Sequence, residues 1–122
     1  MDHLTEEIIK DCRQKLISTK SELLNRLKEI KREYDGNDFG GDEADQSMSV
    51  LAENEFLANQ NRIRHQLVEV ESALARMEQG RYGICEETEE FIETDRLKAI
   101  PWTRLSIEGA EVREAMQKRF AR

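Results

Sequence analysis

Two stretches of this chain decide its fold: IKDCRQKLISTKSELLNRLKEI at residues 9–30 and FLANQNRIRHQLVEVESALARM at residues 56–77. In each stretch an apolar residue recurs at every seventh position. These residues are Ile9, Leu16, Leu23 and Ile30 in the first, and Phe56, Ile63, Val70 and Met77 in the second. A heptad repeat places such side chains on one narrow stripe of an α-helix, which must be buried to be stable. Because each stripe is the simplest partner for the other, we predict an antiparallel coiled-coil hairpin over residues 1–79.

Turn-forming residues between the two stretches set the expected helix boundaries. The first helix should run from about residue 4 to residue 34, because the segment DGNDFGG at residues 35–41 favours turns and left-handed backbone. The second should begin between residues 42 and 49 and continue to about residue 79, where Gly80 provides a C-terminal stop. Three polar residues are candidate N-caps of the second helix, namely Asp45, Ser47 and Ser49.

Residues 80–122 are less regular and contain few apolar side chains. The expected elements are two short strands, one helical turn and a last helix, at Tyr82–Cys85, Glu90–Ile92, Asp95–Ala99 and Ile107–Phe120 respectively. Such a short segment cannot bury enough surface to fold alone, so it should pack against the base of the hairpin. We therefore expect a mostly α-helical protein with two domains, the hairpin at residues 1–79 and a small lobe with a C-terminal helix at residues 80–122.

The composition argues against several classes of function. Of the 122 residues, 37% are charged and 38% are hydrophobic, and the formal net charge is −7. A nucleic-acid-binding domain would show a basic patch, so we expect no direct DNA binding and favour a basic protein partner or a positively lined cavity. No apolar run is long enough for a transmembrane helix, and the N-terminus has no features of a secretory signal. The two cysteines, Cys12 and Cys85, form no disulfide framework, which indicates a cytoplasmic protein.

The connection between the two helices is strongly acidic. Five carboxylates lie within eleven positions without a basic residue among them, namely Asp35, Asp38, Asp42, Glu43 and Asp45. One interpretation is a solvated turn whose acids cap a helix. The other is an acidic tip over residues 35–47 that enters a positively charged or metal-containing cavity, since paired carboxylates can bind magnesium. The residues alone leave both interpretations open.

Four motifs along the chain are arranged as in a known family. The tip reads DEADQS at residues 42–47, and both of its aspartates match the family pattern Asp-Pro-x-Asp-Arg-Ala. The lobe reads GICEETEEFI at residues 83–92, RLKAIP at 96–101 and LSIEG at 105–109. The corresponding family patterns are Gly-x-Cys-x-x-Cys-Gly-x-x-Ile, Arg-Leu-x-Ala-x-Pro and Leu-Cys-x-x-Cys. On these motifs the chain resembles the DksA/TraR family of bacterial transcription regulators.

This resemblance implies a function as well as a fold. Family members enter the secondary channel of bacterial RNA polymerase with the tip of their coiled coil. The resemblance implies that Asp42, Asp45 and Ser47 meet the polymerase and that the chain alters the stability of promoter open complexes. It also implies a monomer that has no membrane association and is not an enzyme. Two alternatives stay open, a coiled-coil adaptor with other partners and a transcript-cleavage-type factor that acts through magnesium at the tip.

The zinc ligands of the family are mostly replaced in this chain. Their four positions hold Cys85, Thr88, Ser106 and Gly109. One thiolate and two hydroxyl groups cannot supply the donors of a structural zinc site, so we expect no metal and no other cofactor. An apolar core should then hold the lobe together, and its candidate members are Phe91, Ile100 and Trp102. Cys12 falls among apolar positions of the first helix, and we expect it to serve as packing.

A second departure concerns the alarmone ppGpp, the signal of the stringent response. The family positions at which basic residues help to hold ppGpp correspond here to Glu69, Ile100 and Ala110. A carboxylate at position 69 would repel the phosphates that a basic residue binds. We therefore expect a TraR-like action that does not need ppGpp.

Overall fold

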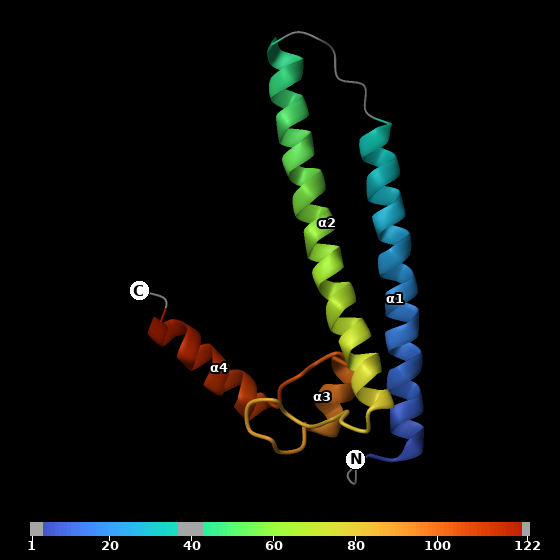
Figure 1. Cartoon of the computed structure of the whole chain (residues 1–122), viewed down its shortest axis with the longest axis vertical. Coiled ribbons are helices and arrows are strands. Elements are labelled where there is room, and N and C mark those ends of the chain that lie inside the picture. Colours follow the sequence, from blue (N-terminus) through green and yellow to red (C-terminus); the bar gives the residue numbers. More distant parts are fainter. Residues whose placement is uncertain (1–3, 37–42, 121–122) are drawn as a thin grey trace. The chain divides into compact units, whose positions relative to one another are not determined.

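The computed structural model describes residues 4–36 and 43–120, which form four α-helices (Figure 1). The helices are α1 (Glu6–Asp35), α2 (Glu43–Glu78), α3 (Thr94–Ala99) and α4 (Ile107–Phe120). The expected mostly helical fold, with a long antiparallel hairpin of α1 and α2, is confirmed. Among the described residues, no helix combines the length and the apolarity that crossing a membrane requires.

Helix α2 begins before all three of its candidate caps. Asp45, Ser47 and Ser49 lie inside the helix, so the prediction that one of them caps it is wrong. The sequence contains no glycine or proline from residue 43 to residue 79, so nothing forces the helix to begin later. Asp42, which precedes the first helical residue, lies outside the described residues.

The other end of α2 stops where the sequence predicted. Gly80 has a positive φ of 73°, a conformation that glycine adopts without steric cost. Its N–H donates to the carbonyl of Met77 at 3.3 Å, and the N–H of Arg81 donates to the carbonyl of Arg76 at 2.9 Å. These two bonds form a Schellman motif, which satisfies the last carbonyls of the helix and turns the chain into the lobe.

By packing, the chain divides into two compact units whose limits lie inside α1 and α2. The hairpin unit comprises Thr19–Val68, and the lobe unit comprises Met1–Ser18 together with Glu69–Arg122. The lobe unit therefore includes one end of each long helix, which supplies the packing surface that the short lobe lacks. The expected division of the chain into domains at residue 79 stays a prediction.

The heptad residues form the core of the hairpin unit. Leu23 of α1 is buried, as are Ile63 and Leu67 of α2. Farther along the same helices, the rings of Tyr34 and Phe56 stack with their centroids 4.4 Å apart and an angle of 13° between their planes. The seam between the helices is thus the one that the seven-residue repeat predicts.

The core of the lobe unit joins both long helices to the lobe. Its buried apolar residues include Cys12, Leu16, Val70, Ala73 and Met77 from the helices, and Tyr82, Cys85, Ile92 and Leu97 from the lobe. The Cys12 thiol donates to the carbonyl of Leu97 at 3.8 Å, and Lys15 Nζ donates to the carbonyl of Lys98 at 2.8 Å. Burial raises the pKa of Tyr82, whose hydroxyl donates to the carbonyl of Pro101 at 2.8 Å. Cys12 is buried packing, as the sequence predicted.

The residues that fill the lobe core differ from those expected. Phe91 and Trp102 are 51% and 36% exposed, and Ile100 is partly exposed, so the prediction that these three form the core is wrong. In place of two strands, the described lobe residues form one antiparallel bridge, between Ile84 and Phe91. Because successive residues of an extended segment point to opposite sides, the burial of Ile92 turns Phe91 outward.

Candidate functional site

The four positions that correspond to zinc ligands come together in the lobe. Cys85 follows the bridge residue Ile84, and Thr88 lies in the turn just after it. Ser106 immediately precedes α4, and Gly109 belongs to the first turn of that helix. The thiol of Cys85, which is 1% exposed, forms hydrogen bonds with the hydroxyl groups of Ser106 and Thr88. The hydroxyl of Ser106 also accepts the N–H of Gly109 at 3.0 Å and so caps the helix.

The contact between Gly109 and Cys85 leaves no room for a side chain. A Cβ atom added to Gly109 would lie 2.4 Å from Sγ of Cys85 and 3.3 Å from Oγ of Ser106. The shorter distance is far below a van der Waals contact, so any larger residue requires the thiol to move. Glycine is therefore what allows α4 to approach the thiol this closely.

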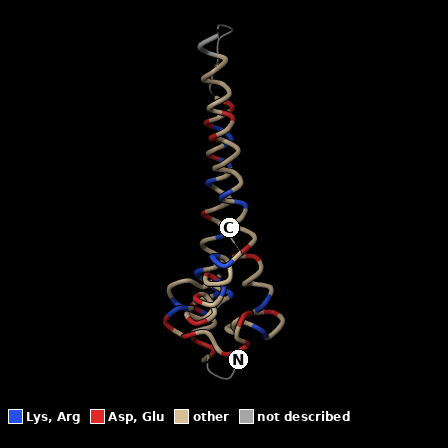
Figure 2. Tube along the Cα trace, turned by 90° about the vertical axis from the view of Figure 1, so that its left-hand side faces the viewer, with Lys and Arg blue, Asp and Glu red and all other residues tan. Residues whose placement is uncertain are grey.

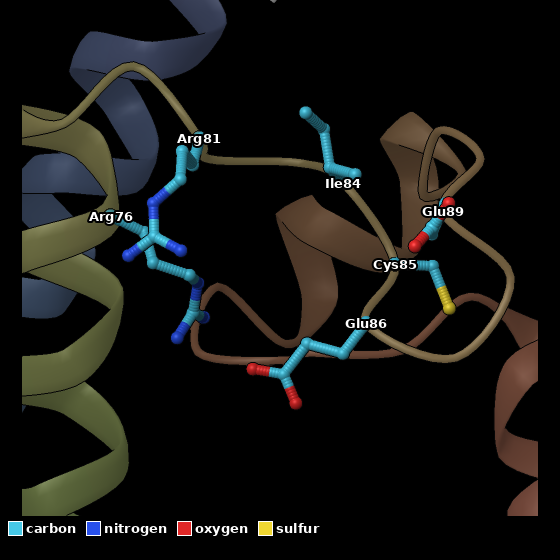
Figure 3. Close-up of a pocket in the computed structure, with 6 residues that line it drawn as sticks. All are labelled: Arg76, Arg81, Ile84, Cys85, Glu86 and Glu89. Atoms are coloured by element: carbon cyan, nitrogen blue, oxygen red, sulfur yellow. The ribbon is translucent and has the colours of Figure 1, made fainter.

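Opposing effects act on the acidity of the Cys85 thiol. Burial alone raises its pKa, but the hydrogen bonds from Ser106 and Thr88 outweigh burial and lower the pKa from 9.0 to about 7. A pocket of about 260 Å³ lies beside Cys85, with Arg76 and Arg81 on its other side (Figure 3). Figure 3 shows the sulfur directed away from both guanidinium groups, so hydroxyl groups rather than arginines account for the lowered pKa.

These residues do not fit the zinc site that the resemblance implies. A structural zinc site takes four donors, whereas this cluster offers one thiol, two weakly coordinating hydroxyl groups and a glycine without a side chain. Among the described residues, no group of three or more His, Cys, Asp or Glu side chains could hold a metal ion. The lobe must therefore be held together by other interactions.

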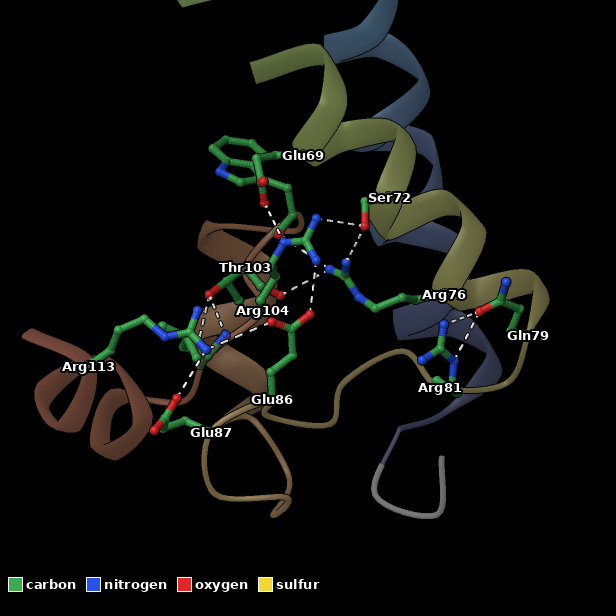
Figure 4. A network of polar contacts seen from close by, with 12 residues as sticks. Glu69, Ser72, Arg76, Gln79, Arg81, Glu86, Glu87, Thr103, Arg104 and Arg113 are labelled. Atoms are coloured by element: carbon green, nitrogen blue, oxygen red, sulfur yellow. Dashed lines mark hydrogen bonds and ion pairs between the residues drawn. The ribbon is translucent and has the colours of Figure 1, made fainter. Parts of the chain in front are cut away.

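A network of charged side chains joins α2 to the lobe (Figure 4). At its centre Arg104 donates from Nε to Glu69 Oε2 at 2.8 Å, from Nη1 to Glu86 Oε1 at 2.9 Å and from Nη2 to Ser72 Oγ at 2.8 Å. The hydrogen bond to Glu69 is the largest cause of a raised pKa of Arg104, and it outweighs the lowering by burial. One planar guanidinium group thus connects two residues of α2 with a residue of the lobe.

The same network reaches helix α4. Arg113 of α4 donates from Nη2 to Glu87 Oε2 at 3.1 Å and lies 4.0 Å from Glu86 Oε2. Glu86 therefore lies between two guanidinium groups, one in the loop and one on α4. The carboxylate of Glu93 accepts the N–H of Ile107 at 3.2 Å, at the first residue of α4. These contacts fix the beginning of α4 where the family would place a zinc ion.

A second arginine, Arg76 of α2, is almost entirely buried. It is 7% exposed, and it donates to Oγ of Ser72 at 2.9 Å and to the carbonyls of Trp102 and Thr103, both at 3.3 Å. Burial, followed by the positive charge of Arg104, lowers the pKa of Arg76. Because carbonyl groups are its main partners, this buried cation fixes the loop after α3 against α2.

The sequence analysis did not single out this network. A signal was available, since the adjacent carboxylates of Glu86 and Glu87 stand in a loop that has lost its metal ligands. Adjacent carboxylates favour nearby cations, and the lobe supplies Arg104 and Arg113. Spacing along the sequence could not show which arginine meets which carboxylate.

The positions that correspond to a ppGpp site are partly brought together. Glu69 and Ile100 line one pocket of about 310 Å³, together with three arginines, Arg96, Arg104 and Arg113. Ala110 is not among the described residues that line it. The carboxylate of Glu69 is engaged by Arg104, so the pocket contains an internal ion pair at the place where the family has basic residues.

The residues expected to meet a partner at the tip lie at the edge of what the structure describes. Asp42 lies outside the described residues. Asp45 belongs to the first turn of α2, and Ser47 of the same helix is exposed.

Comparisons with known proteins agree with this architecture. The profile of the prokaryotic dksA/traR C4-type zinc finger matches residues 80–115. The RNA polymerase-binding transcription factor DksA of Caulobacter vibrioides is 33% identical over 110 residues, which cover 87% of this chain and 75% of that protein. The chain belongs to the DksA/TraR family.

Two more relatives of this DksA/TraR protein show how far the likeness extends. The solved structure of transcription factor DksA2 from Pseudomonas aeruginosa superimposes with a TM-score of 0.85 at 28% identity, covering 95% of this chain and 90% of that one. General stress protein 16O of Bacillus subtilis is 40% identical over 55 residues, which are 44% of this chain and 34% of that protein. The fold of this DksA/TraR member is thus retained although Cys85 is the only one of the four zinc positions still occupied by cysteine.

Proposed function

We propose that this chain is a DksA-like transcription factor that binds bacterial RNA polymerase through the secondary channel. The observation that carries this proposal is the 33% identity, across 87% of the chain, to a protein named as an RNA polymerase-binding transcription factor. The likeness of fold to DksA2 supports it. The chain would act as a cytoplasmic monomer, without contacting DNA and without catalysing a reaction. It would alter the lifetime of promoter open complexes by shifting the population of polymerase conformations.

The acidic tip is the part of the chain that we propose for this effect, with Asp42, Asp45 and Ser47 as its contacts. Residues 33–58, which we call the acidic end, contain eight carboxylates and no basic residue. Such a run of like charge is suited to a positively charged or metal-containing cavity. The spacing of Asp42 and Asp45 matches the tip pattern of the family, and this match supports the proposal.

The ion pair of Glu69 supports an action that does not need ppGpp. A nucleotide that carries several phosphates would meet the carboxylate of Glu69 in the pocket that it shares with Ile100. Arg104 also lines this pocket, but three of its five N–H donors already bond to Glu69, Glu86 and Ser72. We also propose that the lobe carries no zinc. Stoichiometric zinc in the purified protein would contradict this proposal of a zinc-free lobe.

Transcription in vitro from a ribosomal promoter, with and without ppGpp, tests the proposal. The variant Asp45→Asn should lose its effect on open-complex lifetime, because it removes a tip charge, while its binding to polymerase stays near the wild-type value. Glu78→Gln is the matched control, since it makes the same charge change at an exposed position of α2 outside the acidic end. The wild-type effect should not depend on ppGpp.

Three results would count against the proposal, each in a different way. Full activity of Asp45→Asn would show that the tip is only a turn. A large enhancement by ppGpp that disappears on changing Glu69 would contradict the ppGpp-independent action. Failure of the wild-type chain to bind polymerase would favour the coiled-coil adaptor instead.

A further inference from the structure

A glutamate stands where the lobe pattern of the family has its second glycine. In GICEETEEFI at residues 83–92, this position is Glu89. The backbone of Glu89 has a positive φ of 62°, a conformation that glycine adopts freely and that strains a residue with a side chain. No other non-glycine residue in the described part of the chain has a positive φ. The chain thus keeps the conformation of the glycine and adds a carboxylate there, at a cost in backbone strain.

The side chain of Glu89 lines the pocket of about 260 Å³ beside Cys85, which we call the Glu89 pocket. Figure 3 shows two arginines on the opposite side of this pocket, Arg76 from the last turn of α2 and Arg81 just after the helix. Ile84, which is partly exposed, adds an apolar lining residue. The Glu89 pocket therefore has a positive side, a negative side and an apolar part.

The outermost charges of the Glu89 pocket have no ionic partner within the described residues. Figure 2 shows both acidic and basic positions in the lobe, and Arg104 and Arg113 each form ion pairs with two carboxylates. Arg81 and Glu89 form no such pair with any described residue. Arg81 donates instead from Nε and Nη2 to the neutral amide oxygen of Gln79. One cation and one anion thus face the same pocket without neutralising each other.

Arg76 adds a buried positive charge to the same side. Its hydrogen bonds go to a hydroxyl group and two carbonyl groups, none of which carries a charge. The carboxylates of Glu69 and Glu86 raise its pKa, but both already bond to Arg104. Glu86 also lines the pocket, where its bond to Arg104 offsets its charge. Because a buried cation is stabilised by an anion beside it, the positive side of the pocket is suited to a carboxylate.

We infer that the Glu89 pocket binds a small zwitterion, namely a free α-amino acid with an aliphatic side chain. The carboxylate of the amino acid pairs with Arg81 and Arg76, its ammonium group pairs with Glu89, and its aliphatic part covers Ile84. The ligand is small, because the volume is below the range of about 300–1,000 Å³ that drug-sized ligands occupy. Phosphate fits less well, since it leaves the carboxylate of Glu89 unpaired.

Bound amino acid would join the end of α2 to the turn that follows Cys85. A ligand that binds the folded chain and not the unfolded chain stabilises the fold. Binding should therefore be visible both as heat in a titration and as a raised midpoint of thermal unfolding. The inference does not depend on polymerase binding, so the failure of either proposal leaves the other standing.

The test titrates three matched probes into the full-length chain by isothermal titration calorimetry. L-Valine carries both charges, 3-methylbutanoate lacks the ammonium group, and 2-methylpropylamine lacks the carboxylate. L-Valine should bind about tenfold or more tightly than either of the other probes, because each of them loses one charge-assisted contact. Thermal unfolding, followed by circular dichroism, should shift to higher temperature with L-valine well above its Kd.

Two variants assign the contacts to single residues. Glu89→Gln should bind L-valine and 3-methylbutanoate equally, because the ammonium group loses its partner. Arg81→Gln should weaken the binding of both probes on the order of tenfold. The matched control is Glu90→Gln, which makes the same charge change at an exposed neighbouring position that does not line the Glu89 pocket. The control should bind L-valine as the wild type does, and far-UV circular dichroism of each variant checks the fold.

Four results would overturn the inference. The first is that L-valine neither binds the wild type nor shifts its thermal unfolding. The second is that L-valine binds no more tightly than 3-methylbutanoate, which would make the pocket a site for simple anions. The third is equal weakening by Glu90→Gln, which would mean that general charge matters and not the pocket. The fourth is tighter binding of inorganic phosphate than of L-valine, lost in Arg81→Gln, which would reassign the pocket to phosphate.

Discussion

Replacement of Gly109 by alanine tests whether α4 closes directly over the Cys85 thiol. The new Cβ would lie 2.4 Å from Sγ of Cys85, so the sulfur would have to move. A movement would disturb the hydrogen bonds with Ser106 and Thr88 that lower its pKa, and overpacking of a buried site costs about 1–3 kcal/mol. Alanine in a helix gains about 0.5–1 kcal/mol over glycine. We therefore expect a net loss of about 1–2 kcal/mol in the free energy of unfolding.

Urea unfolding followed by circular dichroism measures this loss directly. The double variant Cys85→Ala/Gly109→Ala removes the sulfur that the new Cβ would meet, so it should be more stable than the sum of the two single changes implies. A coupling energy of about 1 kcal/mol or more would identify the clash as the cause. If Gly109→Ala instead stabilises the protein, as in an open helix, or if the two changes are additive, the close contact between α4 and the thiol does not exist.

Two further perturbations address the ion pairs and the thiol. Arg104→Gln leaves two carboxylates without their shared partner, and because these are partly exposed, the expected loss on urea unfolding is about 1 kcal/mol and becomes smaller at high salt. Arg81→Gln, at an exposed arginine outside this network, is its control and should change stability little. For the Cys85 thiol, the folded chain has a pKa of about 7 against an ordinary 9.0, so the folded state binds the proton more weakly. The free energy of unfolding should thus rise by roughly 1–3 kcal/mol from pH 7 to pH 9. The contribution of the thiol should stay constant above pH 9 and should be absent below pH 7. Urea unfolding across this pH range should lose that rise in Cys85→Ser, and the same rise in the variant would refute the role of the thiol.

The hairpin could be predicted because its signal repeats many times along the chain. Each buried heptad residue, such as Leu23 or Ile63, supports the same interpretation as its neighbours. The stop at Gly80 was also predictable, since a single residue supplies the positive φ that the end of the helix requires. Helix α2 begins at Glu43, within the expected range of residues 42–49, but its cap was not predictable, because a serine or aspartate that can cap a helix can also stand inside one. Whether such a residue caps the helix or stands inside it depends on whether the residues before it are helical as well.

No repeating pattern in the sequence shows which residues fill the core of the lobe. Phe91 and Ile92 are neighbours of similar apolarity, and one bridge to Ile84 decides which of them is buried. Tyr82 is fully buried because the carbonyl of Pro101 accepts its hydroxyl, a partner that lies 19 positions away. Without a repeating period there was no reason in the sequence to prefer these residues.

The candidate site, too, could be predicted only in part from the sequence. The positions of Cys85, Thr88, Ser106 and Gly109 were identified by motif spacing, and the structure brings them together. The partners of Arg104 lie 35, 32 and 18 positions away from it along the chain, on two different elements. Long-range pairing of common charged residues leaves no pattern in a single sequence, so the network became evident only in the folded chain.

One residue links the loss of the metal to the proposed loss of ppGpp binding. The carboxylate of Glu69 holds Arg104, and through it the loop that a zinc ion would otherwise organise. The same carboxylate would oppose phosphate in the pocket beside it, which Arg96, Arg104 and Arg113 also line. A lysine at position 69 would add a positive charge to the pocket, but it would also place two cations side by side and leave the hydrogen bond to Ser72 as the link between Arg104 and α2. A basic residue at this position would therefore weaken the contact between α2 and the lobe unless Arg104 changed with it. Glu69 thus joins the loop of the metal-free lobe to α2 and at the same time reduces the positive charge of the pocket.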